Sequence, residues 1–283
     1  MKEALQFYID NDLNEAISEK SQNYFLQKDI PKKNVEKKAP EVQIKTIEKP
    51  IIKPIFSTSD ALGQLAKKSQ NMSNQNQEFL SLNEIIAKAK KIANACQNLD
   101  ELRSALEKFD GCNLKKMATN LVFADGNPKA KVMVIGEAPG NNEDLQGIPF
   151  CGDSGKLLDE IFRSIDLSRK ENLYITNVIF WRPPGNRRPT DEELAICKPF
   201  VERHIQLVDP KVIVLVGATS MAAILENNEP VSKIRGQLMD FSASFLPKKI
   251  KTFAIFHPSY LLRQPSKKRI AWVDMLTLEK FLK

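Results

Sequence analysis

The sequence predicts an α/β protein, a three-layer α/β/α sandwich around a central four-stranded parallel sheet. Four short, mostly apolar runs lack the apolar–polar alternation of strands with one exposed face, so both faces of each strand are expected to be covered. Helical spacing of apolar side chains falls between and after these runs. Strands that alternate with helices predict a parallel sheet with helices on both faces. The expected strands are 132–135, 173–179, 212–216 and 252–256, and the expected helices are 154–165, 191–207, 219–225 and 268–282.

The predicted sandwich occupies residues 81–283. It starts with Ser81-Leu82-Asn83-Glu84, a capping-box pattern that predicts the beginning of a helix, and a second helix is expected at about 100–109. Residues 1–20 predict a short amphipathic helix, and residues 21–80, rich in lysine and proline, predict a disordered linker. The N-terminal helix then either docks on the sandwich or is a tethered segment that recruits a protein partner, and we prefer the second alternative.

Composition narrows the class of partner. The chain of 283 residues has 42 Lys and Arg against 35 Asp and Glu, a net charge of +7, which favours a polyanionic partner, although the linker lysines supply part of it. The four cysteines form no C-x-x-C pair, and neither a signal-peptide pattern nor a membrane-spanning apolar run is found in the sequence. We therefore expect a monomer in the reducing cytoplasm with no membrane partner.

Polar or turn-forming residues lie at or near the carboxyl end of each predicted strand. In a parallel sheet with right-handed crossovers, the carboxyl ends of all strands lie along one rim, where open α/β sheets bind their ligands. That rim is expected to collect Glu137, Asn177, Gly217 and His257. The loop Glu137-Ala138-Pro139-Gly140 can direct a carboxylate and backbone N–H groups into the same crevice.

Three common glycine motifs do not fit the loop that follows the first strand. A P-loop needs Gly-Lys followed by Ser or Thr, whereas Gly155-Lys156 is followed by Leu157. The dinucleotide fingerprint G-x-G-x-x-G is also missing after this strand. The segment Gly152-Asp153-Ser154-Gly155 is like the nucleophile segment of trypsin-like proteases, but the strand and helix pattern is not that of a double β-barrel.

Asn177 and His257 are the polar side chains of greatest interest on the rim. A carboxamide has one acceptor and two donors in a plane and suits the edge of an amide-like ring, although a satisfied core Asn is the alternative. A histidine at a strand end can donate a hydrogen bond to charge that develops on a leaving group, although a lone His is more often structural. The loop 181–189 carries Arg187 and Arg188 and suits phosphates.

The order of motifs GEAPGNNED, GIPFCGDSGKLL, YITNV, WRPPGNRRPTDEE, LVGATS and FHPSYLLR resembles the family 4 uracil-DNA glycosylases over about residues 109–281. The resemblance implies hydrolysis of the N-glycosidic bond of uracil that is flipped out of DNA, in a bacterial base excision repair pathway. The alternative is a module that binds damaged or abasic DNA without cutting it and recruits a partner through the N-terminal helix. A weaker alternative is a nucleotide-binding α/β protein of another class.

The resemblance also implies roles for single residues. Glu137 would position or activate the attacking water, with Glu143 or Asp144 as the rival carboxylate. Phe150 would stack on uracil, Asn177 would read its polar edge, and His257 would stabilise the departing base. The remaining implied contacts are pocket lining by Ala138, Gly140 and Glu143, and DNA contacts by Ser259, Leu261, Leu262 and Arg263, beside Arg187 and Arg188.

Two departures from the family pattern are expected to matter. The family usually holds a 4Fe-4S cluster through four cysteines, and the matching positions here are Phe109, Cys112, Trp181 and Cys197. Since only two thiols remain, the sequence predicts an enzyme with no cofactor or metal. A shared metal or a disulfide between Cys112 and Cys197 is the minor alternative, which a reducing compartment disfavours. A related branch is trapped covalently on DNA through a histidine, and the corresponding loop 186–189 has none, so a monofunctional hydrolytic enzyme is predicted.

Overall fold

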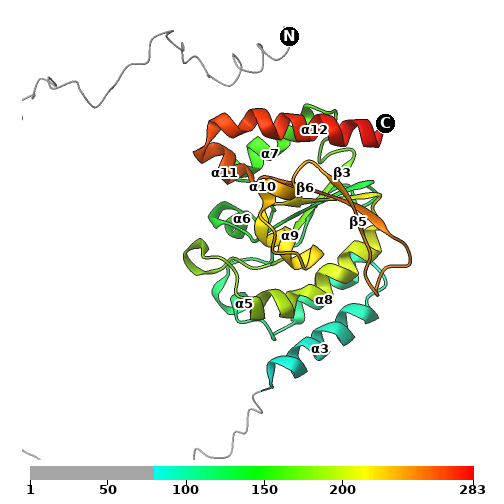
Figure 1. Cartoon of the computed structure of the whole chain (residues 1–283). Coiled ribbons are helices and arrows are strands. Elements are labelled where there is room, and N and C mark those ends of the chain that lie inside the picture. Colours follow the sequence, from blue (N-terminus) through cyan, green and yellow to red (C-terminus); the bar gives the residue numbers. More distant parts are fainter. Residues whose placement is uncertain (1–79) are drawn as a thin grey trace, which may run out of the picture. The chain divides into compact units, whose positions relative to one another are not determined.

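The computed structural model describes residues 80–283. The helix predicted over residues 1–20 and nearly all of the linker predicted over 21–80 lie outside these residues. The described part is built on a six-stranded sheet in the order β1-β3-β2-β4-β6-β5 (Figure 1). Its strands are β1 (Asp125–Gly126), β2 (Val132–Gly136), β3 (Leu173–Asn177), β4 (Val212–Val216), β5 (Leu238–Phe241) and β6 (Ile250–Ile255).

The four central strands confirm the predicted parallel sheet. β2 pairs in parallel with β3 and β4, and β4 pairs in parallel with β6. The two edge strands are additional and antiparallel, β1 on β3 and β5 on β6. β1 has only two residues and β5 is partly exposed, so neither has the continuous apolar run that identifies the central strands.

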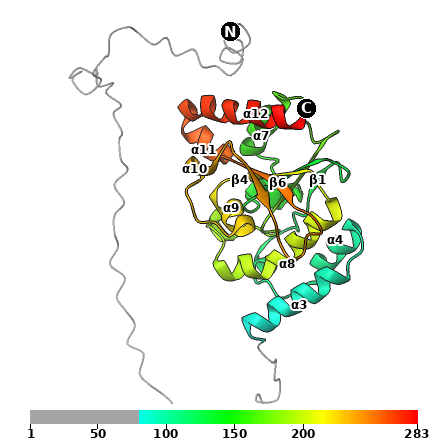
Figure 2. The same ribbon diagram turned by 45° about the vertical axis from the view of Figure 1, so that its right-hand side comes forward.

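Helices cover both faces of the sheet (Figures 1 and 2). Side chains of β2 show the division, because Met133 and Ile135 belong to one core cluster whereas Val132 and Val134 belong to the other. This alternation follows from the two-residue period of a strand. The first face carries α3 (Leu82–Ala95), α4 (Leu99–Lys108), α8 (Asp191–Val208) and α9 (Ala218–Leu225), and the second carries α7 (Asp153–Arg163) and α12 (Lys268–Leu282).

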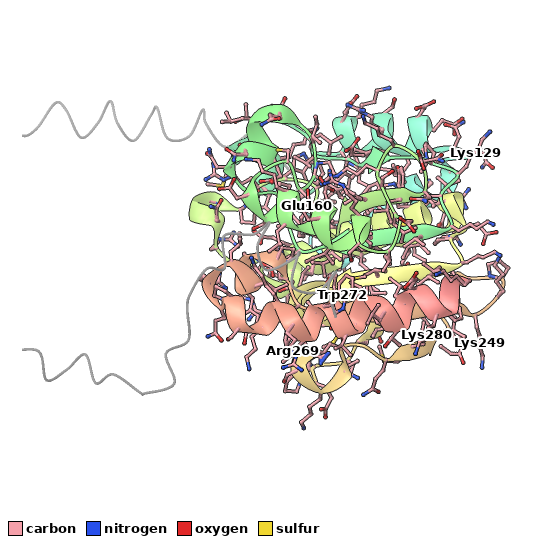
Figure 3. All side chains as sticks on the ribbon, turned by 90° about the horizontal axis from the view of Figure 1, so that it is seen from above. Lys129, Glu160, Lys249, Arg269, Trp272 and Lys280 are labelled. Carbon is pink, nitrogen blue, oxygen red and sulfur yellow. The ribbon has the colours of Figure 1, made fainter. Side chains whose placement is uncertain are left out.

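Local signals explain where the longer helices begin. Ser81 caps α3, and Glu84 accepts hydrogen bonds from the Ser81 backbone N–H and hydroxyl, both at 2.7 Å. Thr190 and Glu193 form the same reciprocal cap at the start of α8. α12 crosses the second face, with Arg269 and Lys280 extending from near its two ends (Figure 3).

Several short helices lie in the connections and were not expected from the sequence. Two of them follow central strands directly, α6 (Asn141–Gln146) after β2 and α11 (Pro258–Arg263) after β6. The others are α5 (Leu114–Met117), α10 (Val231–Ile234) and the 3₁₀ turns η2 (Pro184–Asn186) and η3 (Pro265–Lys267). Within residues 80–283, no helix combines the length and apolarity that crossing a membrane requires.

Candidate active site

A cleft of about 740 Å³ lies at the carboxyl ends of the central strands. Glu137, Asn177, Gly217 and His257 line it, one from the end of each of the four parallel strands, as the strand pattern predicts. Most of the other predicted site residues also line this cleft. They are Ala138, Gly140, Glu143, Phe150, Arg187, Arg188, Ser259, Leu262 and Arg263.

Asn177 lines the cleft and is buried, with 1 % of its surface exposed. Its Oδ1 atom has no hydrogen-bond partner in the described part of the chain. The structure therefore does not support the alternative that Asn177 is a core asparagine with all its polar atoms hydrogen-bonded. Leaving a buried polar atom unpaired costs about 1–3 kcal/mol, and a ligand that donates to it recovers that cost.

The Phe150 ring packs beside Asn177 and His257. Its centroid lies 5.8 Å from that of the His257 imidazole, with the two planes tilted by 33°. A Cβ atom at Gly136 would lie 2.4 Å from both the Phe150 ring and Asn177 Oδ1, so only glycine allows this approach. The Phe150 backbone has a φ of +52°, in the left-handed region that a bulky residue rarely adopts.

The three carboxylates near this loop have different surroundings. Glu143 accepts hydrogen bonds from the backbone N–H groups of Gly140 at 3.1 Å, Cys151 at 3.0 Å and Gly152 at 2.9 Å. Asp144 is buried and accepts from the N–H groups of residues 119 and 120. The Glu137 side chain makes no hydrogen bond or ion pair with the described residues, so its carboxylate remains available within the cleft.

His257 caps the N-terminus of α11. Its Nδ1 atom accepts from the Ser259 backbone N–H at 3.2 Å and lies 2.9 Å from the Ser259 hydroxyl. Burial lowers the pKa of His257, although the nearby Glu137 carboxylate opposes this shift. A neutral imidazole that accepts at Nδ1 carries its proton on Nε2. His257 is therefore a neutral hydrogen-bond donor at neutral pH.

The arginines of the loop 181–189 are held by other side chains. Arg187 forms a bidentate ion pair with Glu193 at 2.6 and 2.9 Å, and Arg188 donates to the Thr219 hydroxyl at 3.1 Å. Arg182, which the sequence did not single out, donates to Asn186 at 2.7 Å and to Asn141 at 2.8 Å. It thereby joins the loop 181–189 to α6.

The two leucines of α11 have opposite surroundings. Leu261 has no exposed surface and packs in a small cluster with Leu157 and Ala271. Leu262 is 44 % exposed, and Arg263 beside it is exposed as well. A nucleic acid at the mouth of the cleft can therefore reach Leu262 and Arg263, whereas the side chain of Leu261 holds α11 to the body of the protein.

Cys112 and Cys197 are buried thiols joined by a hydrogen bond. That bond and burial raise the pKa of Cys197, and the bond lowers the pKa of Cys112. Phe109 packs edge-on against Phe200 with centroids 5.0 Å apart, and Trp181 is buried in the same core. In residues 80–283, no group of three or more His, Cys, Asp or Glu side chains could hold a metal ion.

Comparison with known proteins identifies the family. A model of the uracil DNA glycosylase superfamily matches residues 123–277. The chain is 36 % identical over 181 residues to a Type-4 uracil-DNA glycosylase of Sulfurisphaera tokodaii, over 62 % of this chain and 81 % of that protein. It is 39 % identical over 173 residues to one of Archaeoglobus fulgidus, over 60 % and 85 %. It is 38 % identical over 181 residues to one of Thermotoga maritima, over 63 % and 91 %.

The prediction of an enzyme without a cofactor needs correction. It rested on two missing cysteines, but the relatives that the chain matches are Type-4 glycosylases, which are iron–sulfur enzymes. A 4Fe-4S cluster takes four cysteine ligands. The described residues offer two neighbouring thiols, Cys112 and Cys197, so they do not by themselves fit a complete cluster site.

The matched region contains the whole sheet and the cleft. It begins before β1 and ends within α12, and it includes Glu137, Phe150, Asn177 and His257. It covers more than half of the chain, and the identity to the three relatives extends over most of their lengths. The chain belongs to the uracil DNA glycosylase superfamily.

Proposed function

We propose that the cleft binds a uracil base flipped out of DNA and that this enzyme hydrolyses its N-glycosidic bond, releasing uracil and leaving an abasic site. The observation that carries this proposal is the buried, unpaired amide of Asn177, which lies in one cleft with Glu137, Phe150 and His257. Flipping is required because the glycosidic bond cannot be reached within stacked DNA. Membership of the glycosylase superfamily supports the same reaction.

Asn177 and Phe150 supply recognition of the base. The carboxamide pairs with the N–H and C=O on the edge of uracil, while the Phe150 ring offers an apolar surface for stacking. Cytosine presents a different set of donors and acceptors on that edge, so it would leave polar groups of the site unpaired. The backbone of Ala138 and Gly140 completes the pocket wall.

Glu137 positions and activates the attacking water. The rival carboxylates are already used, because Glu143 accepts from three backbone N–H groups and Asp144 accepts from two. A water held by Glu137 can attack the sugar carbon as the bond to the base breaks. Glu143 contributes to substrate binding through the shape of the loop that it holds.

His257 stabilises the departing base. A neutral imidazole with its proton on Nε2 can donate to a uracil oxygen as negative charge develops there. Its lowered pKa keeps it neutral down to more acidic pH than a free histidine, so it needs no proton from solvent for this role. Ser259 fixes the imidazole by occupying Nδ1.

DNA is held at the mouth of the cleft. Arg263 and Leu262 on α11 supply a cation for phosphate and an exposed apolar side chain to press into the duplex. Arg187 and Arg188 also line the cleft, and Ser259 offers a hydroxyl to a phosphate. Phosphate contacts of this kind make binding fall with added salt.

The cellular setting extends this proposal. Four free thiols suit a reducing cytoplasm. A monomeric state stays a prediction. A bacterial source stays a prediction, since the relatives come from archaea and bacteria. A protein partner for residues 1–20 is a further prediction, on a segment outside the described residues.

Uracil release from a labelled oligonucleotide with one uracil, followed by alkaline cleavage, tests the function. The wild-type protein should cut at uracil and not at cytosine, and Glu137→Gln should reduce single-turnover cleavage at least a hundredfold. The matched control is Glu160→Gln, an exposed carboxylate on α7 far from the cleft lining. Full activity of the Glu137 variant would refute the assigned role, and no cleavage by the wild type would refute the function.

A further inference from the structure

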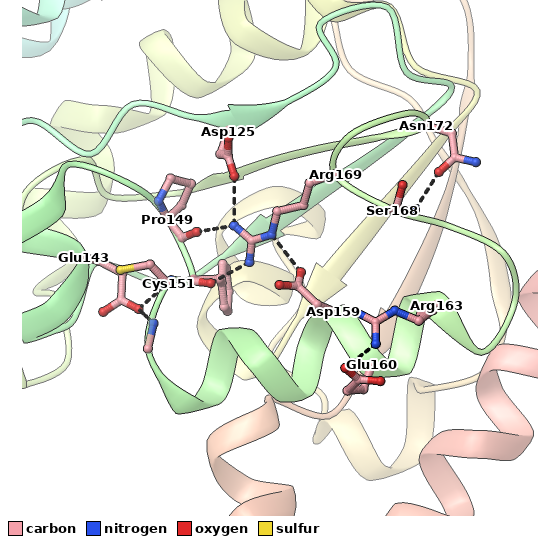
Figure 4. A network of polar contacts seen from close by, with 12 residues as sticks. Asp125, Glu143, Pro149, Cys151, Asp159, Glu160, Arg163, Ser168, Arg169 and Asn172 are labelled. Atoms are coloured by element: carbon pink, nitrogen blue, oxygen red, sulfur yellow. Dashed lines mark hydrogen bonds and ion pairs between the residues drawn. The ribbon is translucent and has the colours of Figure 1, made fainter. Parts of the chain in front are cut away.

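Arg169, in the loop between α7 and β3, does not line the cleft but makes four polar contacts around Phe150 (Figure 4). Its guanidinium donates to the carbonyl oxygens of Pro149 at 2.6 Å and Phe150 at 2.5 Å. It also binds the carboxylates of Asp159 at 2.7 Å and Asp125 at 3.1 Å. Its side chain is only 15 % exposed.

The Phe150 segment is thus held on both sides. Arg169 binds the carbonyl oxygens of residues 149 and 150, while Glu143 binds the backbone N–H groups of residues 151 and 152. Gly155 adds a close approach, since a Cβ atom there would lie 1.7 Å from the Phe150 carbonyl oxygen. Four consecutive residues are therefore fixed through their backbone groups.

This arrangement is needed because Phe150 has an unfavourable backbone conformation. A φ of +52° is adopted by a bulky residue only where its surroundings impose it. Two hydrogen bonds from a cation to consecutive carbonyls are stronger than neutral ones. They turn the Phe150 carbonyl toward Arg169, and the ring lies in the cleft beside His257.

We infer that Arg169 is a positioning residue for base recognition, acting through the backbone of Phe150. It anchors its own guanidinium on Asp159 of α7 and Asp125 of β1, so the orientation of the stacking ring is set by the framework of the domain. This inference rests on the proposed role of Phe150 as the surface on which uracil stacks. Arg169 touches neither the base nor the water in this scheme.

The test is a double-mutant cycle in the full chain with Arg169→Ala, Phe150→Ala and the double variant. Single-turnover uracil excision and inhibition by free uracil are measured for each protein. Arg169→Ala should lower excision about ten- to a hundredfold and weaken uracil inhibition by a similar factor, as expected for loss of hydrogen bonds to a charged group. In the Phe150→Ala background the same substitution should cost less than about threefold.

Controls separate positioning from general stability. Arg163→Ala removes an exposed arginine of α7 that pairs with Glu160 at 2.5 Å, and it should leave excision within about twofold of wild type (Figure 4). If Arg169→Ala does not fold, Arg169→Lys replaces it in the cycle. A lysine keeps the charge but can bind only one of the carbonyl oxygens of Pro149 and Phe150 well. It should show a smaller loss with the same dependence on Phe150.

The outcomes distinguish this inference from the proposed function. Equal losses from Arg169→Ala with and without Phe150 would overturn the inference, because the effect would not pass through the ring. An unimpaired Phe150→Ala variant would remove both the stacking role and the inference. A wild-type protein that cuts no uracil would refute the function alone. In that case the affinity of the four proteins for uracil-containing DNA would be measured by fluorescence anisotropy. If the effects of Arg169→Ala and Phe150→Ala on this affinity simply add, the inference is overturned.

Discussion

Replacing Glu143 and Glu137 by glutamine, one at a time, should separate a structural carboxylate from a catalytic one. Glu143 accepts three backbone N–H groups at 2.9–3.1 Å. A glutamine oxygen can keep at most two of these bonds, both without charge, and its NH₂ group faces the third N–H. At about 2 kcal/mol for a hydrogen bond to a charged group and about 1 kcal/mol for a neutral one, Glu143→Gln should lower the free energy of unfolding by about 2–4 kcal/mol.

Glu137→Gln should leave stability nearly unchanged and reduce activity strongly. The Glu137 side chain makes no hydrogen bond or ion pair with residues 80–283, so the substitution should change stability by less than about 0.5 kcal/mol. It should nevertheless abolish most uracil excision. Urea unfolding followed by far-UV circular dichroism measures the first quantity, and single-turnover excision well below the unfolding midpoint measures the second.

Two results would refute this reasoning. One is a Glu143→Gln protein as stable as wild type, which would mean that the three N–H groups find other partners. The other is a Glu137→Gln protein that is destabilised by several kcal/mol while its residual activity remains high. Glu160→Gln serves as the matched control, since this exposed carboxylate on α7 is outside the cleft lining and pairs with Arg163 at 2.5 Å.

Three further predictions follow from single side chains. Asn177→Leu removes an unpaired buried amide, so excision should fall more than a hundredfold while urea unfolding shows unchanged or up to about 1 kcal/mol higher stability; a large stability loss would contradict this. Burial lowers the pKa of His204 to about 3, below its unfolded value of about 6.5, so the unfolded chain takes up the proton first and stability falls as pH drops below about 6.5. His204→Gln, which can still bond Tyr174, should reduce that slope by about 1.4 kcal/mol per pH unit in urea titrations at pH 4–6.5, and an unchanged slope would count against it. Leu262→Ala should slow excision from duplex more than from single-stranded DNA, whereas Leu261→Ala should chiefly lower thermal stability; equal effects on both substrates would argue against duplex contact by Leu262.

The sheet and the rim could be predicted from the sequence because their signals are local. Val132 to Ile135 and Val212 to Val216 are continuous apolar runs, and strands buried on both faces need such runs. Parallel pairing then brings the residues after each strand to the same edge, whatever the detailed packing. This is why the sequence could predict that Glu137 and His257 lie at the same edge of the sheet, where both line the cleft.

The use of each carboxylate could not be predicted in the same way. Glu137, Glu143 and Asp144 are close in the sequence, and nothing in their neighbours distinguishes them. What separates them is backbone geometry, since Glu143 finds the N–H groups of residues 151 and 152 only when the loop has folded back. Arg169 was missed for the same reason, because its partners are 10 to 44 residues away.

The two leucines of α11 show a second limit. A helix of six residues is too short for apolar periodicity to identify its inner face. The sequence analysis therefore predicted the same role, contact with DNA, for Leu261 and Leu262. In the structure Leu261 is buried and Leu262 is exposed. The edge strands β1 and β5 escaped prediction because two to four residues with partial exposure give no distinct pattern.

The shortness of α11 has a consequence for how recognition and chemistry are coupled. His257 caps one end of this helix, and Leu262 and Arg263 lie in its last turn, so about one and a half turns separate the proposed leaving-group donor from the proposed DNA contacts. In the proposed mechanism, a duplex that contacts Leu262 would act on the same short helix that positions the imidazole. A strand that binds differently at the mouth of the cleft would then also shift this donor, so the helix would couple recognition of the DNA to the chemistry.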